Sequence, residues 1–374
     1  MCASRKYSNT SKQFIIHYLI LVLVIIPATR QIFASEETLD DTGAMVLVLE
    51  DCDSDNKLST APYGDTVSLI NSEGELIRVV THGLSITDGC CELSISEDGR
   101  FFAVCDKAAN ILTVYETATG RKLWSLSGIF NSAVFANSLL YAYNSESIFA
   151  IDNSGTIVKH SRLGALDIAI DQTHNCLWIS GLDIKKCNLD LEAVLTIKGF
   201  EGLKVPFIIE ANPNGSIWIV QDVYEQYSRE NRLMKISPEG KVLRTINLEF
   251  SPASVCVDKS DGSVWTTGRI KKRDFSRFGD ELPESLNALN ELVTTKTEVY
   301  TCKYDSEGNW VFVISKGGYA IELDQSDGSA WIAGKTNVWH YSPKGRLLAV
   351  YTGSSDCQKW LAIIPGTKKL IACR

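Results

Sequence analysis

Apolar and polar residues alternate along this chain in short runs that end at glycine turns. The stretch "SVCVDKSDGSVWTTG", from Ser254 to Gly268, returns almost unchanged as "AIELDQSDGSAWIAG", from Ala320 to Gly334. Each copy has an alternating segment, an Asp-Gly pair and a second segment containing a Trp. Alternation with a period of two predicts strands, and Gly supplies the positive φ that a tight hairpin turn needs. The repeated unit is therefore predicted to be a β-hairpin, and weaker copies place Trp178 and Trp218 at the same point.

A second hairpin without a Trp alternates with the first along the chain. Examples are "LMKISPEGKVLRTI" and "VWHYSPKGRLLAVY". We name the strands of the Trp hairpin a and b, and those of the second hairpin c and d. Trp178 and Trp218 are 40 residues apart, and Trp218 and Trp265 are 47 apart. This is the period of four-stranded propeller blades, so we predict an all-β fold: a seven-bladed β-propeller.

The two ends of the chain supply complementary halves of one blade. The first c–d hairpin, residues 66–80, lacks a clear a strand before it, and the last a–b hairpin, "KWLAIIPGTKKLIACR", has no c–d hairpin after it. A blade shared by the N- and C-terminal strands removes the exposed strand edges. Two segments compete for the b position of this closing blade, residues 44–50 and residues 369–374.

The turn Asp-x-x-Asp-Gly-Ser-aliphatic-Trp of these blades resembles that of NHL-type and streptogramin-lyase-like β-propellers. The resemblance covers nearly all of the mature chain and implies the fold. Lyases of that group use a His with a bound metal, and related gluconolactonase-like propellers use a Glu/Asn/Asp metal site at the central channel. No matching His-and-acid motif occurs here, so no catalytic residue is transferred. A metal-dependent lyase or lactonase-type enzyme at the central channel is the alternative to a binding or scaffold module.

The first residues have the layout of a secretory signal. Arg5, Lys6 and Lys12 precede an apolar run of thirteen residues, 14–26, and small residues follow up to Ala34. This order of basic, apolar and small residues is typical of a cleaved signal, and the run is shorter than the ~20 residues that span a bilayer. We therefore predict a signal peptide over 1–34, a single propeller domain over 35–374, and a secreted or periplasmic protein. Membrane attachment is expected only if the signal stays uncleaved.

Charge and cysteine content add to this interpretation. The formal net charge of −8 argues against binding to nucleic acid. In an oxidising compartment the cysteines are expected to pair. A two-residue turn at Gly181-Leu182 would place Cys176 opposite Cys187. The candidate disulfides are Cys176–Cys187, Cys91–Cys105 across an a–b hairpin, and Cys52–Cys373, which would lock the closing blade.

The long b–c segments, which begin at Asp51, Asp222 and Arg269, are expected on one face of the propeller. Loops elaborated on one face of a rigid scaffold usually bind, so a protein or small-molecule ligand is expected there. The insertion 269–298 opens with "RIKKRDFSR", five basic residues in nine, and continues with "ELPESLNALNEL", whose leucine spacing predicts a short helix. The alternative is a solvated charge run before a capping helix. The candidate binding residues are Tyr224, Tyr227, Arg229, Arg269, Lys271, Lys272, Arg273 and Arg277.

One acidic stretch resembles a calcium loop in part. Asp51, Asp53 and Asp55 stand at alternate positions, as in such loops. Asn56 stands where a Gly is needed, and Pro62 stands where the loop would end in a Glu. No cofactor is expected from this pattern, and calcium or another divalent metal is the alternative to a solvated acidic loop.

Overall fold

The structure, a computed structural model, describes most of the unit Thr42–Arg374. The described residues are 46–51, 65–84, 91–107, 109–198, 204–225, 228–274, 294–334, 337–352 and 358–363. Within these ranges every regular element is a strand, and no helix has the length and hydropathy to cross a bilayer. The predicted signal and the predicted helix within 269–298 lie outside the described residues.

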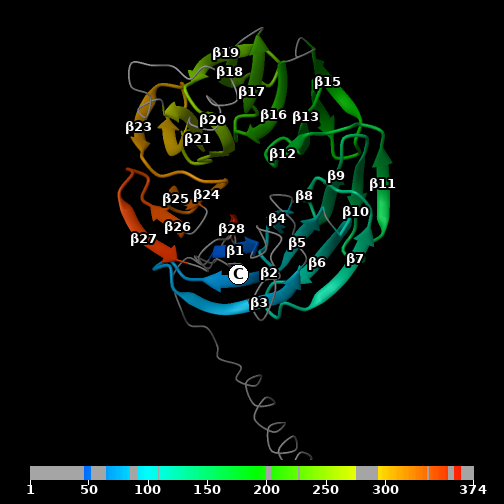
Figure 1. The fold of residues 1–374 in the computed structure, drawn as a ribbon. Coiled ribbons are helices and arrows are strands. Elements are labelled where there is room, and N and C mark those ends of the chain that lie inside the picture. Colours follow the sequence, from blue (N-terminus) through cyan, green and yellow to red (C-terminus); the bar gives the residue numbers. More distant parts are fainter. Residues whose placement is uncertain are drawn as a thin grey trace, which may run out of the picture. The chain divides into compact units, whose positions relative to one another are not determined.

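Seven antiparallel sheets of four strands are arranged in a ring (Figure 1). We number the blades 1 to 6 in chain order and name the seventh the closing blade. From the inside outward, blade 1 has β4 (Cys91–Ile95), β5 (Phe101–Asp106), β6 (Ile111–Glu116) and β7 (Lys122–Ser127). Blade 2 has β8 (Ser132–Ala136), β9 (Leu139–Tyr143), β10 (Ile148–Ile151) and β11 (Ile157–Ser161). Blade 3 has β12 (Asp167–Asp171), β13 (Cys176–Ser180), β14 (Ile184–Asn188) and β15 (Ala193–Ile197).

The remaining blades follow the same order. Blade 4 has β16 (Lys204–Ala211), β17 (Ile217–Glu225), β18 (Ser228–Ile236) and β19 (Val242–Leu248). Blade 5 has β20 (Ser251–Val257), β21 (Val264–Asp274), β22 (Thr294–Tyr304) and β23 (Trp310–Ile314). Blade 6 has β24 (Ala320–Asp324), β25 (Ser329–Ala333), β26 (Asn337–Tyr341) and β27 (Leu347–Thr352). The predicted seven-bladed propeller of four-stranded blades is confirmed.

The closing blade joins the two ends of the described chain. Its order is β28 (Gln358–Ile363), β1 (Val46–Asp51), β2 (Asp65–Ile70) and β3 (Leu76–Leu84). β1 pairs with β28 from Val46↔Ile363 onward and with β2 from Val46↔Ile70 onward. The sharing of one blade by the two chain ends is thus confirmed. β1 occupies the b position; it overlaps the candidate segment 44–50 and extends one residue beyond it.

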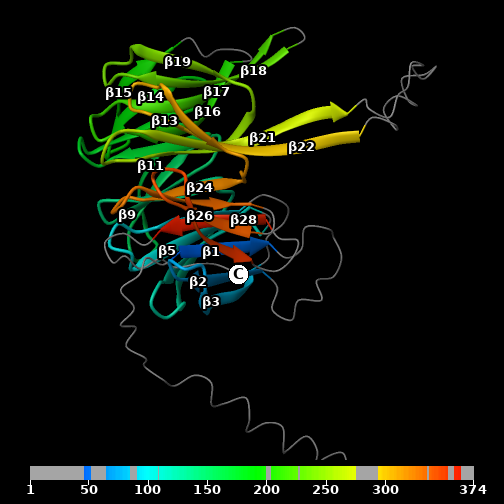
Figure 2. The same ribbon diagram turned by 90° about the vertical axis from the view of Figure 1, so that its left-hand side faces the viewer.

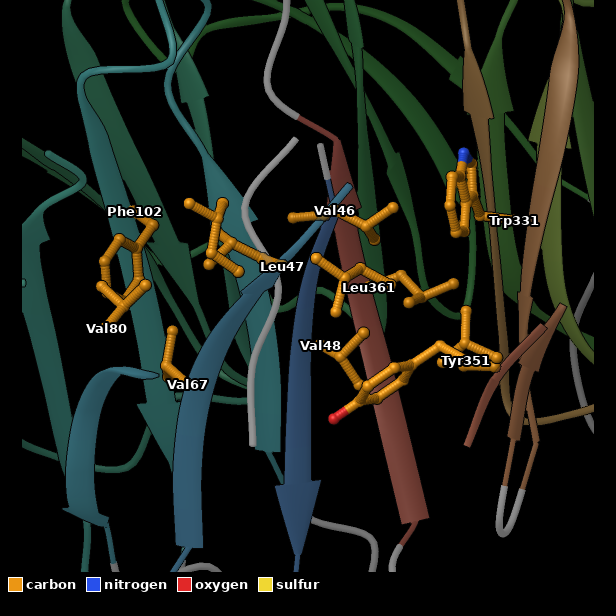
Figure 3. Packing of buried hydrophobic residues seen from close by; sticks show 14 of the residues in the cluster. Val46, Leu47, Val48, Val67, Val80, Phe102, Trp331, Tyr351 and Leu361 are labelled. Carbon is orange, nitrogen blue, oxygen red and sulfur yellow. The ribbon is translucent and has the colours of Figure 1, made fainter. Parts of the chain in front are cut away.

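The closing blade packs on both neighbours through aliphatic side chains. Val46, Leu47 and Val48 of β1 are fully buried, and Leu361 of β28 is 3% exposed. Figure 3 shows these residues between Phe102 of blade 1 and the Trp331 and Tyr351 side chains of blade 6, and all belong to one hydrophobic cluster. Because no covalent bond joins the described ends of the ring, this cluster and the strand pairing hold the blade together.

The turn glycines of the Trp hairpin are required by backbone conformation. Gly262 and Gly328, in the a–b turns of blades 5 and 6, both have φ of 73°. A Cβ at Gly328 would also lie 2.6 Å from Asp258 Oδ2 of the preceding blade, whereas a Cβ at Gly262 would come no closer than 3.4 Å to a neighbour. The Gly of the repeated Asp-Gly pair is therefore required by a left-handed turn conformation in both blades. At Gly328 it is also required by the close approach of the preceding blade.

Each Trp of a b strand faces a cationic or imidazole side chain on strand c. Trp178, Trp218, Trp265 and Trp331 are fully buried. Their partners across β13–β14, β17–β18, β21–β22 and β25–β26 are Lys186, Lys235, Lys303 and His340. The Lys186 and Lys303 ammonium groups lie 5.1 Å from the Trp178 and Trp265 ring centroids, and His340 stacks on Trp331 with 4.0 Å between ring centroids.

Three of these side chains, those of blades 4, 5 and 6, also bind the next blade. Lys235 donates to the Ser306 carbonyl of blade 5, and Lys303 Nζ donates to the Pro343 carbonyl of blade 6 over 3.2 Å. His340 Nδ1 lies 3.1 Å from the Ser72 carbonyl in the c–d turn of the closing blade. Successive blades are therefore linked through one repeated contact, in which a His replaces the Lys where the ring closes.

Two b–c segments that the sequence indicated as loops are continued strands. β17 and β18 pair as far as Glu225↔Ser228, and β21 and β22 pair as far as Asp274↔Thr294. In Figure 2 the end of β18 and the β21–β22 ribbon extend on the same side of the propeller. The expectation of loops at these positions is wrong for 222–225, 228–231, 269–274 and 294–298, where β-branched residues such as Thr295, Thr297 and Val299 favour strands.

The predicted disulfide between Cys176 and Cys187 is wrong. Three residues, 181–183, link β13 to β14 instead of two, so Cys187 pairs with Leu177 and Cys176 with Asn188. A shift of one residue moves a side chain to the other face of the sheet. Cys187 accordingly packs with Ile179 between blades 2 and 3, and Cys176 packs with Ile217 between blades 3 and 4. Both are buried free thiols.

The register also rules out the proposed bridge across the hairpin of blade 1. Cys91 pairs with Asp106, and Cys105 pairs with Glu92. The two cysteines are therefore not opposed, and the expected Cys91–Cys105 disulfide is wrong. The third candidate pair, Cys52 and Cys373, lies outside the described residues.

Candidate functional site

A central channel runs along the innermost strands of all seven blades. Its cavity has a volume of about 480 Å³ and is lined by residues of β4, β8, β12, β16, β20, β24 and β28, which form the inner ring of Figure 1. The inner edge of each of these strands has no neighbouring strand, so the backbone N–H and C=O groups there are available to the channel unless a side chain engages them, as Asp167 does with the Ile209 N–H. The channel therefore offers a ligand many polar groups of the backbone in addition to side chains.

Two glutamates from non-adjacent blades line this channel near the a–b turns. Glu210 of β16 stands opposite Trp218, and Glu322 of β24 stands opposite Trp331. Cys256 of the intervening β20 stands opposite Trp265, at the equivalent place in its blade. No described residue forms a hydrogen bond with either carboxylate. The channel thus contains two carboxyl groups whose hydrogen-bonding capacity is unused by the protein.

Burial and neighbouring charges raise the pKa values of these carboxyl groups. Burial raises the pKa of Glu210 to about 7, against the opposing effect of the Lys259 ammonium. Burial, followed by repulsion from Glu210, raises the pKa of Glu322 to about 8, and Lys259 again opposes the shift. Burial, and then the negative charges of Glu322 and Glu210, raise the pKa of the Cys256 thiol well above its usual value. Both carboxyl groups therefore titrate near neutral pH.

Lys259 is the cation that acts electrostatically on both glutamates. It lies in the turn after β20 and lines the channel. Its backbone N–H donates to Gln325 Oε1 over 2.7 Å, and Gln325 Nε2 donates to the Val257 carbonyl over 3.0 Å. The backbone of Lys259 therefore links the a–b turns of blades 5 and 6, and its side chain is exposed.

The described part of the chain contains no group of three or more His, Cys, Asp or Glu residues that could hold a metal ion. Glu210, Cys256 and Glu322 therefore do not form a metal-ligand set in this arrangement. Asp51 ends β1 opposite Gln358, while Asp53 and Asp55 lie outside the described residues, so the calcium interpretation stays a prediction.

The predicted binding residues lie on two neighbouring blades. Tyr224 and Arg229 stand opposite each other near the end of the β17–β18 hairpin. Arg269, Lys271, Lys272 and Arg273 all belong to β21, opposite Val299, Thr297, Lys296 and Thr295 of β22. Arg269 is exposed. Tyr227 and Arg277 lie outside the described residues. The structure thus brings the basic residues together on one strand, whereas Tyr224 and Arg229 belong to another blade.

Sequence reasoning missed the Glu210–Glu322 pair. The signal was an acidic residue inside an otherwise apolar a strand, in "IIEAN" and "AIELD". Its meaning depends on the blade register, since only the ring shows that the two positions are equivalent and line the same cavity.

The fold and the channel define a seven-bladed β-propeller. No protein-family model matches the chain, and no curated protein matches it by sequence. Among solved structures, it is similar to a functionally unknown protein from Desulfotomaculum acetoxidans, with a TM-score of 0.58, 12% identity, and coverage of 86% of this chain and 99% of that one. It is also similar to a putative 6-phosphogluconolactonase from Bacteroides fragilis, with a TM-score of 0.56, 11% identity, and coverage of 87% and 99%.

A third similar structure is apo AztD from Citrobacter koseri, with a TM-score of 0.51, 10% identity, and coverage of 88% of this chain and 98% of that one. At these identities the similarity shows the fold alone. The narrower resemblance to NHL-type and streptogramin-lyase-like propellers stays a prediction. A β-propeller of this kind supports either a binding or scaffold module or an enzyme-like propeller.

Proposed function

We propose that this protein is an exported binding module, and that an acidic protein surface docks on the face from which the β17–β18 and β21–β22 hairpins extend. The observation that supports this best is the β21–β22 ribbon. β20 pairs with β21 only as far as Ser251↔Arg269, and β23 pairs with β22 only from Thr301. Beyond those points, from Ile270↔Glu298 to Asp274↔Thr294, the two strands pair only with each other.

A two-stranded ribbon of this kind gains little stability by itself. Isolated hairpins are marginal in water, and a third strand or a packed face is usually needed. The ribbon extends beyond the four-stranded blade, and from Ile270↔Glu298 onward no third strand of the described chain pairs with it. A partner that covers the ribbon would supply the missing contacts, which is why we interpret it as a docking element.

The charge of the ribbon indicates the sign of the partner. Four of the five residues from 269 to 273 are basic, and Lys296 stands opposite Lys272. The chain as a whole has a formal net charge of −8. A local basic segment on an acidic protein attracts acidic surfaces and disfavours other orientations. Export rests on the predicted signal over 1–34.

The test uses a fluorescent decaglutamate peptide as the probe. We expect the R269E/K271E/K272E/R273E variant to bind the peptide at least tenfold more weakly than the natural chain, and we expect the natural affinity to fall with added salt. The matched control is R121E/K122E, which reverses two exposed basic residues at the start of β7. A second variant replaces 270–298 with Asn-Gly and keeps the pairing from Val264 to Arg269.

Equal binding by the natural chain, the reversed variant and the control would contradict the proposal. Hydrolysis of a lactone by the purified protein, abolished by a chelator, would instead support the metal-dependent enzyme at the channel.

A further inference from the structure

The central channel contains a second candidate site that is separate from the hairpin face. Its two carboxyl groups come from blades 4 and 6, on either side of Cys256 in blade 5. Both side chains are half-buried and line its cavity of about 480 Å³. Cavities of roughly 300–1,000 Å³ are the usual size for small-molecule sites.

The two carboxyl groups have no hydrogen-bond partner in the described part of the protein. A charge that is partly removed from water is costly unless it is paired and hydrogen-bonded. Neither Glu210 nor Glu322 accepts a hydrogen bond from any described residue. Lys259 interacts with both electrostatically, but one ammonium can balance only one of two ionised carboxylates. One carboxylate of the pair is therefore left without a balancing ammonium when both glutamates are ionised. A third carboxyl group, that of Asp167, also lines the channel, but it accepts hydrogen bonds from the Tyr143 hydroxyl and the Ile209 N–H.

We propose that the central channel binds a small organic diammonium compound, with Glu210 and Glu322 as its anchoring carboxylates. Each ammonium group has three N–H donors, which suit carboxylate oxygens and the unpaired carbonyls at the inner edges of the a strands. An ammonium needs acceptors at hydrogen-bonding distance and does not need three converging metal ligands. The site is thus chemically distinct from the metal centre of the enzyme alternative, and it is independent of docking on the hairpins.

Binding is coupled to protons because the anchors must be ionised. Lys259 acts on both glutamates and Glu210 acts on Glu322, while the Cys256 thiol is itself affected by the two carboxylates. The ionisable side chains of Asp167 and Tyr319 also line the channel. Near pH 6 the two carboxyl groups are protonated and cannot attract an ammonium. Around pH 8.5 they are largely ionised, while a primary diamine is still protonated. Affinity is therefore expected to rise at least tenfold between pH 6 and pH 8.5, with proton release on binding near pH 7.

The experiment is isothermal titration calorimetry of the full chain with 1,4-diaminobutane, in two buffers of different ionisation enthalpy. Glu210→Gln and Glu322→Gln keep the side-chain size and remove the charge. We expect each variant to bind the diamine at least tenfold more weakly and to release fewer protons. Glu307→Gln, at an exposed c–d turn of blade 5, is the matched control and should bind as the natural chain does.

Three outcomes would overturn the proposal. The first is the absence of diamine binding to the natural chain at millimolar concentration, at pH 8.5 as well as at pH 7. The second is natural affinity in both glutamine variants. The third is tighter binding of succinate than of the diamine, which would make Lys259 the anchor. If a glutamine variant unfolds, the pH dependence of binding to the natural chain decides the matter. The reversed-charge ribbon variant should retain diamine binding, so failure of one proposal is distinguishable from failure of the other.

Discussion

Truncation of Leu361 tests how the ring is held closed. Leu361 lies in β28, pairs with Val48 of β1, and is 3% exposed within the cluster that joins the closing blade to blades 1 and 6. Leu361→Ala removes buried methyl groups and leaves a cavity, which costs about 2–5 kcal/mol of the free energy of unfolding. For a domain of this size, whose unfolding entropy is about 0.7 kcal/mol/K, that corresponds to a fall in the melting temperature of roughly 3–7 °C.

The assay is thermal unfolding followed by circular dichroism, with Val350→Ala as the control. Val350 lies on the outermost strand of blade 6 and is 42% exposed, so its truncation should change stability by no more than about 0.5 kcal/mol. Removal of residues 358–374 as a whole should expose the edge of β1 and lower the melting temperature further. If Leu361→Ala and Val350→Ala have the same melting temperature, β28 does not close the ring in the way described.

Two further predictions concern the turns and the inter-blade contacts. Gly328→Ala and Gly262→Ala both place a Cβ at a φ of 73°, which costs about 1–2 kcal/mol of the free energy of unfolding. Urea unfolding should show a loss roughly 1 kcal/mol larger for Gly328→Ala, because only that Cβ meets Asp258 at 2.6 Å. Equal losses in the two variants would contradict the close approach. Burial lowers the pKa of His340 despite the nearby Asp324, Asp327 and Glu73, so the unfolded chain takes up the proton first and stability should fall as the pH drops below about 6.5. His340→Lys, which introduces the residue found at this place in blades 3, 4 and 5, should flatten that pH dependence in melts between pH 5 and 7. An unchanged slope would assign the pH dependence to other groups.

The repeat predicted the architecture because each of its features has a local physical cause. The Asp-Gly turns need a left-handed residue, the Trp hairpins need a buried face, and the period of the Trp residues sets the blade length. The sharing of one blade by the chain ends followed from counting half-blades. Counting half-blades could not decide between 44–50 and 369–374, because both are short apolar segments and only pairing with β28 and β2 distinguishes them.

The site was less accessible to sequence reasoning. The disulfide between Cys176 and Cys187 depended on the length of one turn, and a single extra residue placed the two thiols on opposite faces. The basic segment was recognised, but its strand pairing up to Asp274↔Thr294 was not, because charged residues in a strand resemble those of a loop. Glu210 and Glu322 are 112 positions apart, and they become neighbours across a cavity only once the ring exists.

The order of strands in the closing blade constrains how the chain can fold during synthesis. β1 lies between β2, which follows it closely, and β28, which is made last. Until β28 is available, β1 presents an unpaired edge with apolar side chains, a state prone to pairing with another chain. The β28 strand of a second copy offers the same partner as the chain's own. Domain-swapped dimers can therefore form in this fold during the interval between synthesis of β1 and its pairing with the β28 strand of the same chain.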